Sequence, residues 1–169
     1  NLQSVTNMTT MTTISFNKSP SITKNPCEKI SAIVSLFLPM ASLFSRIIAR
    51  ELPAEIIAED EHFIAFLDIM PLVKGHVLVV PKREVSYIFD LEPSELSSLH
   101  LFTQQVAKAM DKTLTCTRIG MAVIGLEVPH VHIHLVPLRT VDDINFTRPK
   151  LKLTQEELAD TANLIRQGF

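Results

Sequence analysis

The chain has 169 residues, a formal net charge of −2, 46% hydrophobic residues and 20% charged residues. This composition is typical of a globular domain large enough to bury one core. The near-neutral charge argues against a protein that binds a nucleic-acid backbone. The two cysteines, Cys27 and Cys116, lie far apart and form no CxxC pattern. Their usage argues against a disulfide scaffold or a cysteine zinc site and favours a reducing compartment, which we expect to be the cytoplasm.

Residues 1–39 differ from the rest: they hold 12 Ser or Thr, three Lys, one acidic residue (Glu28) and no Gly. Their apolar run at 30–39 is shorter than the about 20 residues that span a bilayer, so we expect no membrane association. Three interpretations stay open: a transit peptide, a secretory segment, or an upstream extension before a start at Met40, which we favour. We expect this extension to be poorly ordered and residues 40–169 to form the domain.

The first elements of the domain follow from apolar spacing. Apolar residues at helical intervals predict a helix over 41–53, which Pro53 ends. Residues 54–69 predict two short strands joined by an acidic turn at 59–61. The run 75–82, bounded by Gly75 and Pro81, predicts a buried strand. A helix over 94–112 follows, with Pro93 in its first turn.

The second half completes the pattern. Residues 118–125 predict a strand, and residues 128–137 predict another. Thr154 and Glu157 form a capping box that begins a terminal helix. Only the helix at 94–112 links consecutive strands through a long helical connection. An α+β fold with an antiparallel or mixed sheet is therefore favoured over a doubly wound parallel one.

The segment "VPHVHIHLVP" at 128–137 places His130, His132 and His134 at alternate positions. In a strand, alternate side chains share one face, so the three imidazoles project together while Val131 and Ile133 face the core. Successive histidine Cα atoms are then about 6.5 Å apart. A purely structural role is disfavoured, because an exposed strand face more often carries Thr, Lys or Glu.

Two chemical interpretations remain. Three histidines on one straight strand do not converge easily on one ion, so a zinc site would need a further ligand such as His76 or Asp68. The interpretation that we favour is nucleophilic. A neutral imidazole can attack phosphorus or a carbonyl and form a covalent intermediate. A neighbouring imidazole on the same face can hydrogen-bond the phosphate oxygens or protonate a leaving group.

"HVHIHLV" at 130–136 resembles the motif of the histidine triad (HIT) family, three histidines alternating with hydrophobic residues. Upstream, the N-terminal helix, "AFLDI", the Pro71 turn and "GHVLVVPK" follow in the family's order, so the resemblance covers residues 40–138. It implies a five-stranded antiparallel sheet with a long helix packed on it and a C-terminal helix, assembled as a homodimer. It also implies a purine nucleotide substrate, no required cofactor, and hydrolysis or nucleotidyl transfer at the α-phosphate of adenosine phosphoramidates or dinucleoside polyphosphates.

The resemblance assigns roles to individual residues. His132 matches the nucleophile that forms a nucleotidyl-histidine intermediate, His134 contacts the phosphate, and His130 and His76 support them. The nucleotide-binding positions that it implies are Asp68 for the ribose, Ile69 and Phe66 for the base, Leu43 and Phe44 closing over the base, and Gly125 before the triad. Each has a plainer alternative: Asp68 can cap a turn, and the three aromatic or leucine positions can be core. We expect His62 and His100 to lie at the surface.

One departure from the family concerns phosphate binding. Many members carry an Asn and a Gly-Gln-Ser/Thr segment before the triad, whereas here Leu126 and Glu127 follow Gly125. A carboxylate in this position predicts weaker phosphate binding, since like charges repel at short range. A weakly catalytic nucleotide-binding or signalling module therefore stays open as a second function, and a zinc-binding protein as a third.

Overall fold

The computed structural model describes residues 41–169, and the predicted extension 1–39 lies outside the described residues. In chain order the elements are α2 (Leu43–Ile48), β1 (Ile56–Glu59), β2 (Phe63–Leu67), β3 (Val77–Pro81), α3 (Pro93–Thr113), β4 (Arg118–Ala122), β5 (Ile133–Leu138) and α4 (Gln155–Arg166). Short 3-10 helices span Ile88–Asp90 and Val141–Ile144. In the described part of the chain, no helix is long and apolar enough to cross a membrane.

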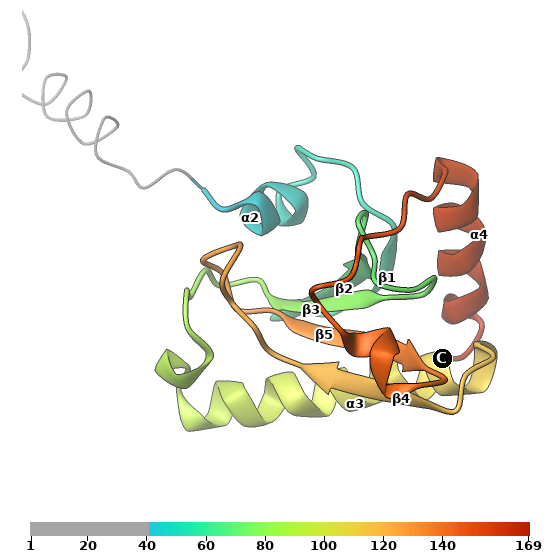
Figure 1. Cartoon of the computed structure of the whole chain (residues 1–169). Helices are drawn as coiled ribbons and strands as arrows, with labels where there is room; N and C mark the ends of the chain where they lie inside the picture. Colours follow the sequence, from blue (N-terminus) through green and yellow to red (C-terminus); the bar gives the residue numbers. More distant parts are fainter. Residues whose placement is uncertain (1–40) are drawn as a thin grey trace, which may run out of the picture. The chain divides into compact units, whose positions relative to one another are not determined.

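The five strands form one sheet in the order β1-β2-β3-β5-β4, and every neighbouring pair is antiparallel. The predicted α+β class and the antiparallel sheet are therefore confirmed. Figure 1 shows α3 running along the sheet and α4 standing beside β1. The capping box predicted at Thr154 and Glu157 is also present: the Thr154 hydroxyl accepts from the Glu157 N–H, and the Glu157 carboxylate accepts from the Thr154 N–H.

Alternation along the strands divides the core into two layers. The larger layer lies between the sheet and α3 and α4, where Val77, Val79, Ile133 and Leu135 pack against apolar side chains of both helices. A smaller layer lies on the opposite face, where α2 covers the strands. Its buried members are Phe44, Ile47, Ile64, Phe66, Leu78 and Val80. The even-numbered side chains of β3 and β5 share this second face, so the histidines lie on the α2 side of the sheet.

The histidine-bearing strand is shorter than predicted. Its hydrogen-bonded ladder with β3 begins only at Ile133, which pairs with Val79. Pro129 has no N–H to contribute, which disfavours an earlier start. In place of ladder bonds, the His130 ring Nε2–H donates to the Pro81 carbonyl (2.8 Å), and the Val131 N–H donates to the Val85 carbonyl (2.7 Å). His130 and His132 therefore precede the strand, yet the predicted alternation of faces holds.

Candidate active site

The histidine face opens on a cleft of about 200 Å³. His132 and His134 line it together with Asp68, and the loop 124–127 forms one of its walls. Gly125 in this loop has φ +71°, a left-handed conformation that glycine adopts without strain. A larger and more apolar cleft of about 600 Å³ adjoins the first, and the two share His132 and residues 124–126. His132 is 95% buried by residue area, but it lies where the two clefts meet.

The hydrogen bonds of His132 define which ring nitrogen is available. Its Nδ1 lies 2.7 Å from the backbone carbonyl of His130. A carbonyl only accepts, so Nδ1 carries the hydrogen. In the neutral ring, Nε2 then keeps its lone pair. The Phe44 ring packs edge-on against the imidazole at 5.0 Å between centroids and restricts its rotation. The second triad histidine is thus held in the tautomer that a nucleophilic Nε2 requires.

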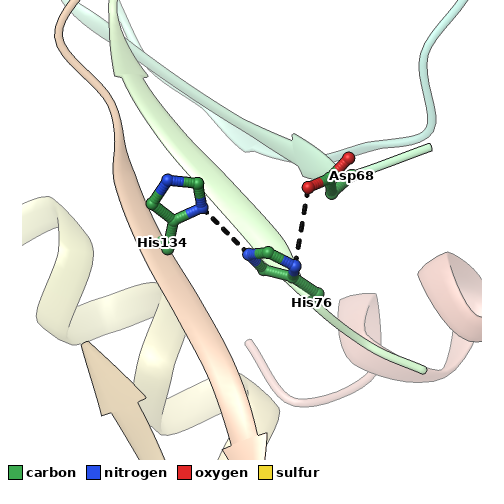
Figure 2. A group of neighbouring side chains, drawn as sticks. All are labelled: Asp68, His76 and His134. Atoms are coloured by element: carbon green, nitrogen blue, oxygen red, sulfur yellow. Dashed lines mark hydrogen bonds and ion pairs between the residues drawn. The ribbon is translucent and has the colours of Figure 1, made fainter. Parts of the chain in front are cut away.

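His76 and His134 belong to a directed chain of hydrogen bonds, and Figure 2 shows the bond between the two rings. The Leu72 N–H donates to His76 Nδ1 at 3.2 Å, so that nitrogen is the acceptor. His76 Nε2–H in turn donates to His134 Nδ1 at 3.0 Å. The remaining nitrogen of His134 is then an N–H donor. The Leu72 amide therefore determines the tautomer of His76 and, through it, the tautomer of His134, whose Nε2–H can donate to a ligand in the cleft.

His130 connects the triad to helix α2. Its Nε2–H donates to Pro81, so Nδ1 accepts from the Ser42 hydroxyl at 2.7 Å. Ser42 is also the N-cap of α2 and accepts from the Ser45 N–H at 3.0 Å. The Glu84 carboxylate accepts from the Ser45 hydroxyl and from the Ser42 N–H, and these bonds hold its pKa below the usual range. This network fixes α2, and with it Phe44, over the triad.

Burial decides the charge state of the buried histidines. It lowers the pKa of both His76 and His134 to about 3, and nearby Lys150 and His132 add to the effect. Burial also lowers the pKa of His130, although the hydrogen bond to Pro81 opposes the shift. Asp68 is affected in the opposite sense, because burial raises the pKa of its carboxyl. His76 and His134 are therefore neutral across the physiological range, and their chain works by hydrogen bonds rather than by charge.

The predicted nucleotide-binding residues are only partly brought together. Asp68 and Gly125 line the cleft. Phe44 and Phe66 are buried and pack on each other at 5.7 Å in the second core layer. Leu43 is exposed on α2, and Ile69 lines a separate small depression near α4. As contacts to a base, these four stay predictions. The expectation that His62 and His100 lie at the surface is confirmed.

Asp68, His76 and His134 also form the one potential metal-ligand cluster within residues 41–169, with ligand atoms within 4.8 Å of one another. Both nitrogens of His76 and Nδ1 of His134 are already engaged, because His76 Nδ1 accepts from Leu72 and His76 Nε2 donates to His134 Nδ1. The Asp68 Oδ2 to His76 Nδ1 separation of 3.5 Å is longer than a good hydrogen bond. A metal here would have to break the hydrogen-bond chain, so the donor set fits a ligand-binding network better than an ion site.

Sequence reasoning missed two parts of this site. Phe146 packs edge-on against His134 at 4.9 Å, and Lys150 lines the cleft beside it. Both belong to an irregular segment after β5 that has no helical or strand period and lies beyond the family-like stretch. Ser42 carried a local signal as an N-cap before an apolar helix. Its bond to His130, 88 positions away, had no signal in the sequence.

Comparisons with known proteins agree with this geometry. The family model described as HIT domain matches residues 49–141. An uncharacterised HIT-like protein of Mycobacterium tuberculosis is 32% identical over 136 residues, which cover 77% of this chain and 94% of that protein. A crystal structure of a Hit-like protein involved in cell-cycle regulation from Bartonella henselae superposes with a TM-score of 0.67 at 27% identity, covering 78% of this chain and 99% of that one.

Two similar proteins have named activities. The adenosine 5'-monophosphoramidase of Saccharomyces cerevisiae is 34% identical over 60% of this chain and 65% of its own length. The asymmetrical bis(5'-nucleosyl)-tetraphosphatase of Schizosaccharomyces pombe is 35% identical over 46% of each chain.

Proposed function

The chain belongs to the histidine triad (HIT) family, and from this membership we propose that it hydrolyses or transfers the nucleotidyl group of purine nucleotide derivatives at the α-phosphate. Adenosine phosphoramidates and dinucleoside polyphosphates are the substrate classes, as the names of the two similar enzymes suggest. The observation that carries the proposal is the tautomer of His132, whose Nδ1–H donates to the His130 carbonyl and leaves Nε2 with its lone pair.

The reaction then has two displacements at one phosphorus. His132 Nε2 attacks the α-phosphorus, the P–N bond forms, and the bond from phosphorus to the leaving group breaks. An amine leaving group takes up a proton from solvent as it departs, whereas a phosphate leaving group departs as the anion. Water next attacks the same phosphorus, the P–N bond breaks, and nucleoside monophosphate and free His132 result. In transfer, another nucleophile takes the place of water.

The neighbouring groups suit this chemistry. His134 offers an N–H donor from the same face, and donors aimed at charge that develops in a transition state are a main source of rate acceleration. Asp68, which lines the same cleft, is the candidate partner for the ribose hydroxyls.

Turnover with a matched pair of variants tests the proposal. The purified chain is incubated with adenosine phosphoramidate and, separately, with diadenosine tetraphosphate, and AMP release is followed by chromatography. The His132→Ala variant should lose turnover by several orders of magnitude, while His62→Ala, which changes an exposed histidine, should keep it. Turnover that is the same in wild type and His132→Ala contradicts the covalent route.

A weakly catalytic nucleotide-binding module is the second candidate, and Glu127 favours it. This carboxylate lines the cleft, where it opposes a phosphate anion. In that case wild type should bind AMP in calorimetry without measurable release of AMP from either substrate.

We also propose that the chain forms a homodimer and is located in the cytoplasm. Analytical ultracentrifugation of the purified chain tests the homodimer.

A further inference from the structure

The charge balance of the cleft points to a residue outside the triad. Three charged side chains line the cleft: the carboxylates of Asp68 and Glu127 and the ammonium of Lys150. His134, which also lines the cleft, is neutral because burial lowers its pKa to about 3. Two carboxylates alone would repel a phosphate at short range. Among residues 41–169, Lys150 is the one lysine or arginine that lines this cleft.

Lys150 is held close to the phosphate-directed donor of the triad. Its Nζ lies 5.0 Å from the centroid of the Phe146 ring, a cation–π contact. The same ring packs edge-on against His134 at 4.9 Å and against His76 at 6.4 Å. The lysine also contributes to the low pKa of both histidines through its charge. Phe146 therefore positions the ammonium beside His134, at the same wall of the cleft.

The ammonium of Lys150 is available to a ligand. None of the ion pairs formed within residues 41–169 includes it. Its neighbour Arg148 pairs with Asp142 and Asp143, and Lys82 pairs with Glu59. A cation–π contact leaves the N–H groups that do not face the ring free to donate. An anion in the cleft is the partner that these donors lack.

We propose that Lys150 binds the phosphate of the substrate. In other members, neutral polar residues before the triad bind this phosphate, whereas this chain has Leu126 and Glu127 there, and Lys150 would replace them. The inference rests on the proposed function and deepens it. It also concerns substrate class, because a polyphosphate leaving group carries further negative charges that an amine does not. Lys150 therefore favours dinucleoside polyphosphates more strongly than phosphoramidates.

Three variants test this assignment. Lys150→Gln removes the charge, Lys150→Arg keeps it, and Lys152→Gln changes an exposed lysine of the same segment that does not line the cleft. With Lys150→Gln we expect kcat/KM for diadenosine tetraphosphate to fall about tenfold to 100-fold, the range for a hydrogen bond to a charged group. The loss for adenosine phosphoramidate should be smaller. Lys150→Arg should retain most of the activity, and Lys152→Gln should change it by no more than about twofold.

A binding measurement separates this proposal from the catalytic one. Calorimetry gives the ratio of the affinities for AMP and adenosine, which reports the contribution of the phosphate whether or not turnover occurs. Lys150→Gln should reduce that ratio about tenfold, and added salt should reduce the wild-type ratio. If wild type shows no His132-dependent turnover but the ratio depends on Lys150, the catalytic proposal fails and the assignment of Lys150 stands.

The opposite results overturn the assignment. A Lys150→Gln variant with the wild-type ratio of AMP to adenosine affinity shows that the lysine does not bind phosphate. A lower Tm with an unchanged ratio shows that the lysine only stabilises the segment around Phe146. An equal loss of kcat/KM for both substrates removes the inference about the leaving group.

Discussion

The buried pair His76 and His134 predicts a strong pH dependence of stability. Both have a pKa of about 3 in the folded chain, whereas an unfolded histidine titrates near about 6.5. As the pH falls through that value, the unfolded chain binds protons that the folded chain does not. The contribution of the two neutral histidines to the free energy of unfolding is therefore fully present above the unfolded pKa and is lost as the pH falls below it.

The magnitude follows from the width of the window. At pH 5 the pH lies about 1.5 units below the pKa of an unfolded histidine, and each unit is worth about 1.4 kcal/mol. Each buried histidine therefore lowers the free energy of unfolding by about 2 kcal/mol. The two together predict that the free energy of unfolding falls by about 4 kcal/mol between pH 7.5 and pH 5. The lowered pKa of His130 acts in the same direction, and the raised pKa of Asp68 opposes it.

Urea unfolding at four pH values between 5 and 7.5 measures this dependence. Carboxylates with a lowered pKa, such as Glu59 and Glu84, titrate below the window and do not contribute within it. In His76→Gln the fall should shrink by about 2 kcal/mol even if the variant is less stable overall. His62→Gln, at an exposed position, should keep the full fall. A free energy of unfolding that is constant between pH 5 and pH 7.5, or an unchanged fall in His76→Gln, would show that His76 does not have a lowered pKa in the folded chain.

Three further outcomes follow from the site. Ser42→Ala, which removes the N-cap of α2 and the bond to His130, should lower the free energy of unfolding by about 1–2 kcal/mol in urea titrations; a loss below about 0.3 kcal/mol contradicts the proposed network. Phe44→Ala should cost about 3–5 kcal/mol in the same assay, because the ring is buried against His132 and the second core layer; full stability would contradict its place there. Glu127→Gln should tighten AMP binding about twofold to fivefold in calorimetry, and weaker binding would show that the carboxylate does not oppose the phosphate.

Local patterns predicted most of the fold. The strands at β2 and β3 were readable because each is a short apolar run bounded by turn residues. The capping box at Thr154 and the Pro93 start of α3 were readable because helix ends depend on neighbouring residues. The start of β5 was placed too early, because residues 130 and 131 bond the carbonyls of Pro81 and Val85 outside the ladder, which begins at Ile133. Pro81 and Val85 lie about 50 positions earlier in the chain, so no local pattern indicates these bonds.

The candidate site also has features that local sequence patterns predict and features that depend on the rest of the fold. Alternation placed His132 and His134 on one face, because strand geometry alone decides it. The tautomers of His130 and His134 could not be predicted, because they depend on partners far along the chain, Pro81 for His130 and His76 for His134. The tautomer of His132 depends on the carbonyl of His130, two residues away, but a hydrogen bond from a ring to a nearby carbonyl has no signal in the sequence. Lys150 was missed for the same reason: its place in the cleft depends on how the segment after β5 folds back over the histidines, and that segment has no periodicity to read.

Trapping the covalent intermediate is the most direct test of the nucleophile. Wild-type protein is mixed with diadenosine tetraphosphate, quenched within the first turnover and digested, and the peptide that spans residues 130–134 is analysed by mass spectrometry. We expect one adenylate on His132, present in wild type and absent in His132→Ala. An adenylate on a different residue, or turnover at full rate without any adduct under conditions that trap phosphohistidine, contradicts it.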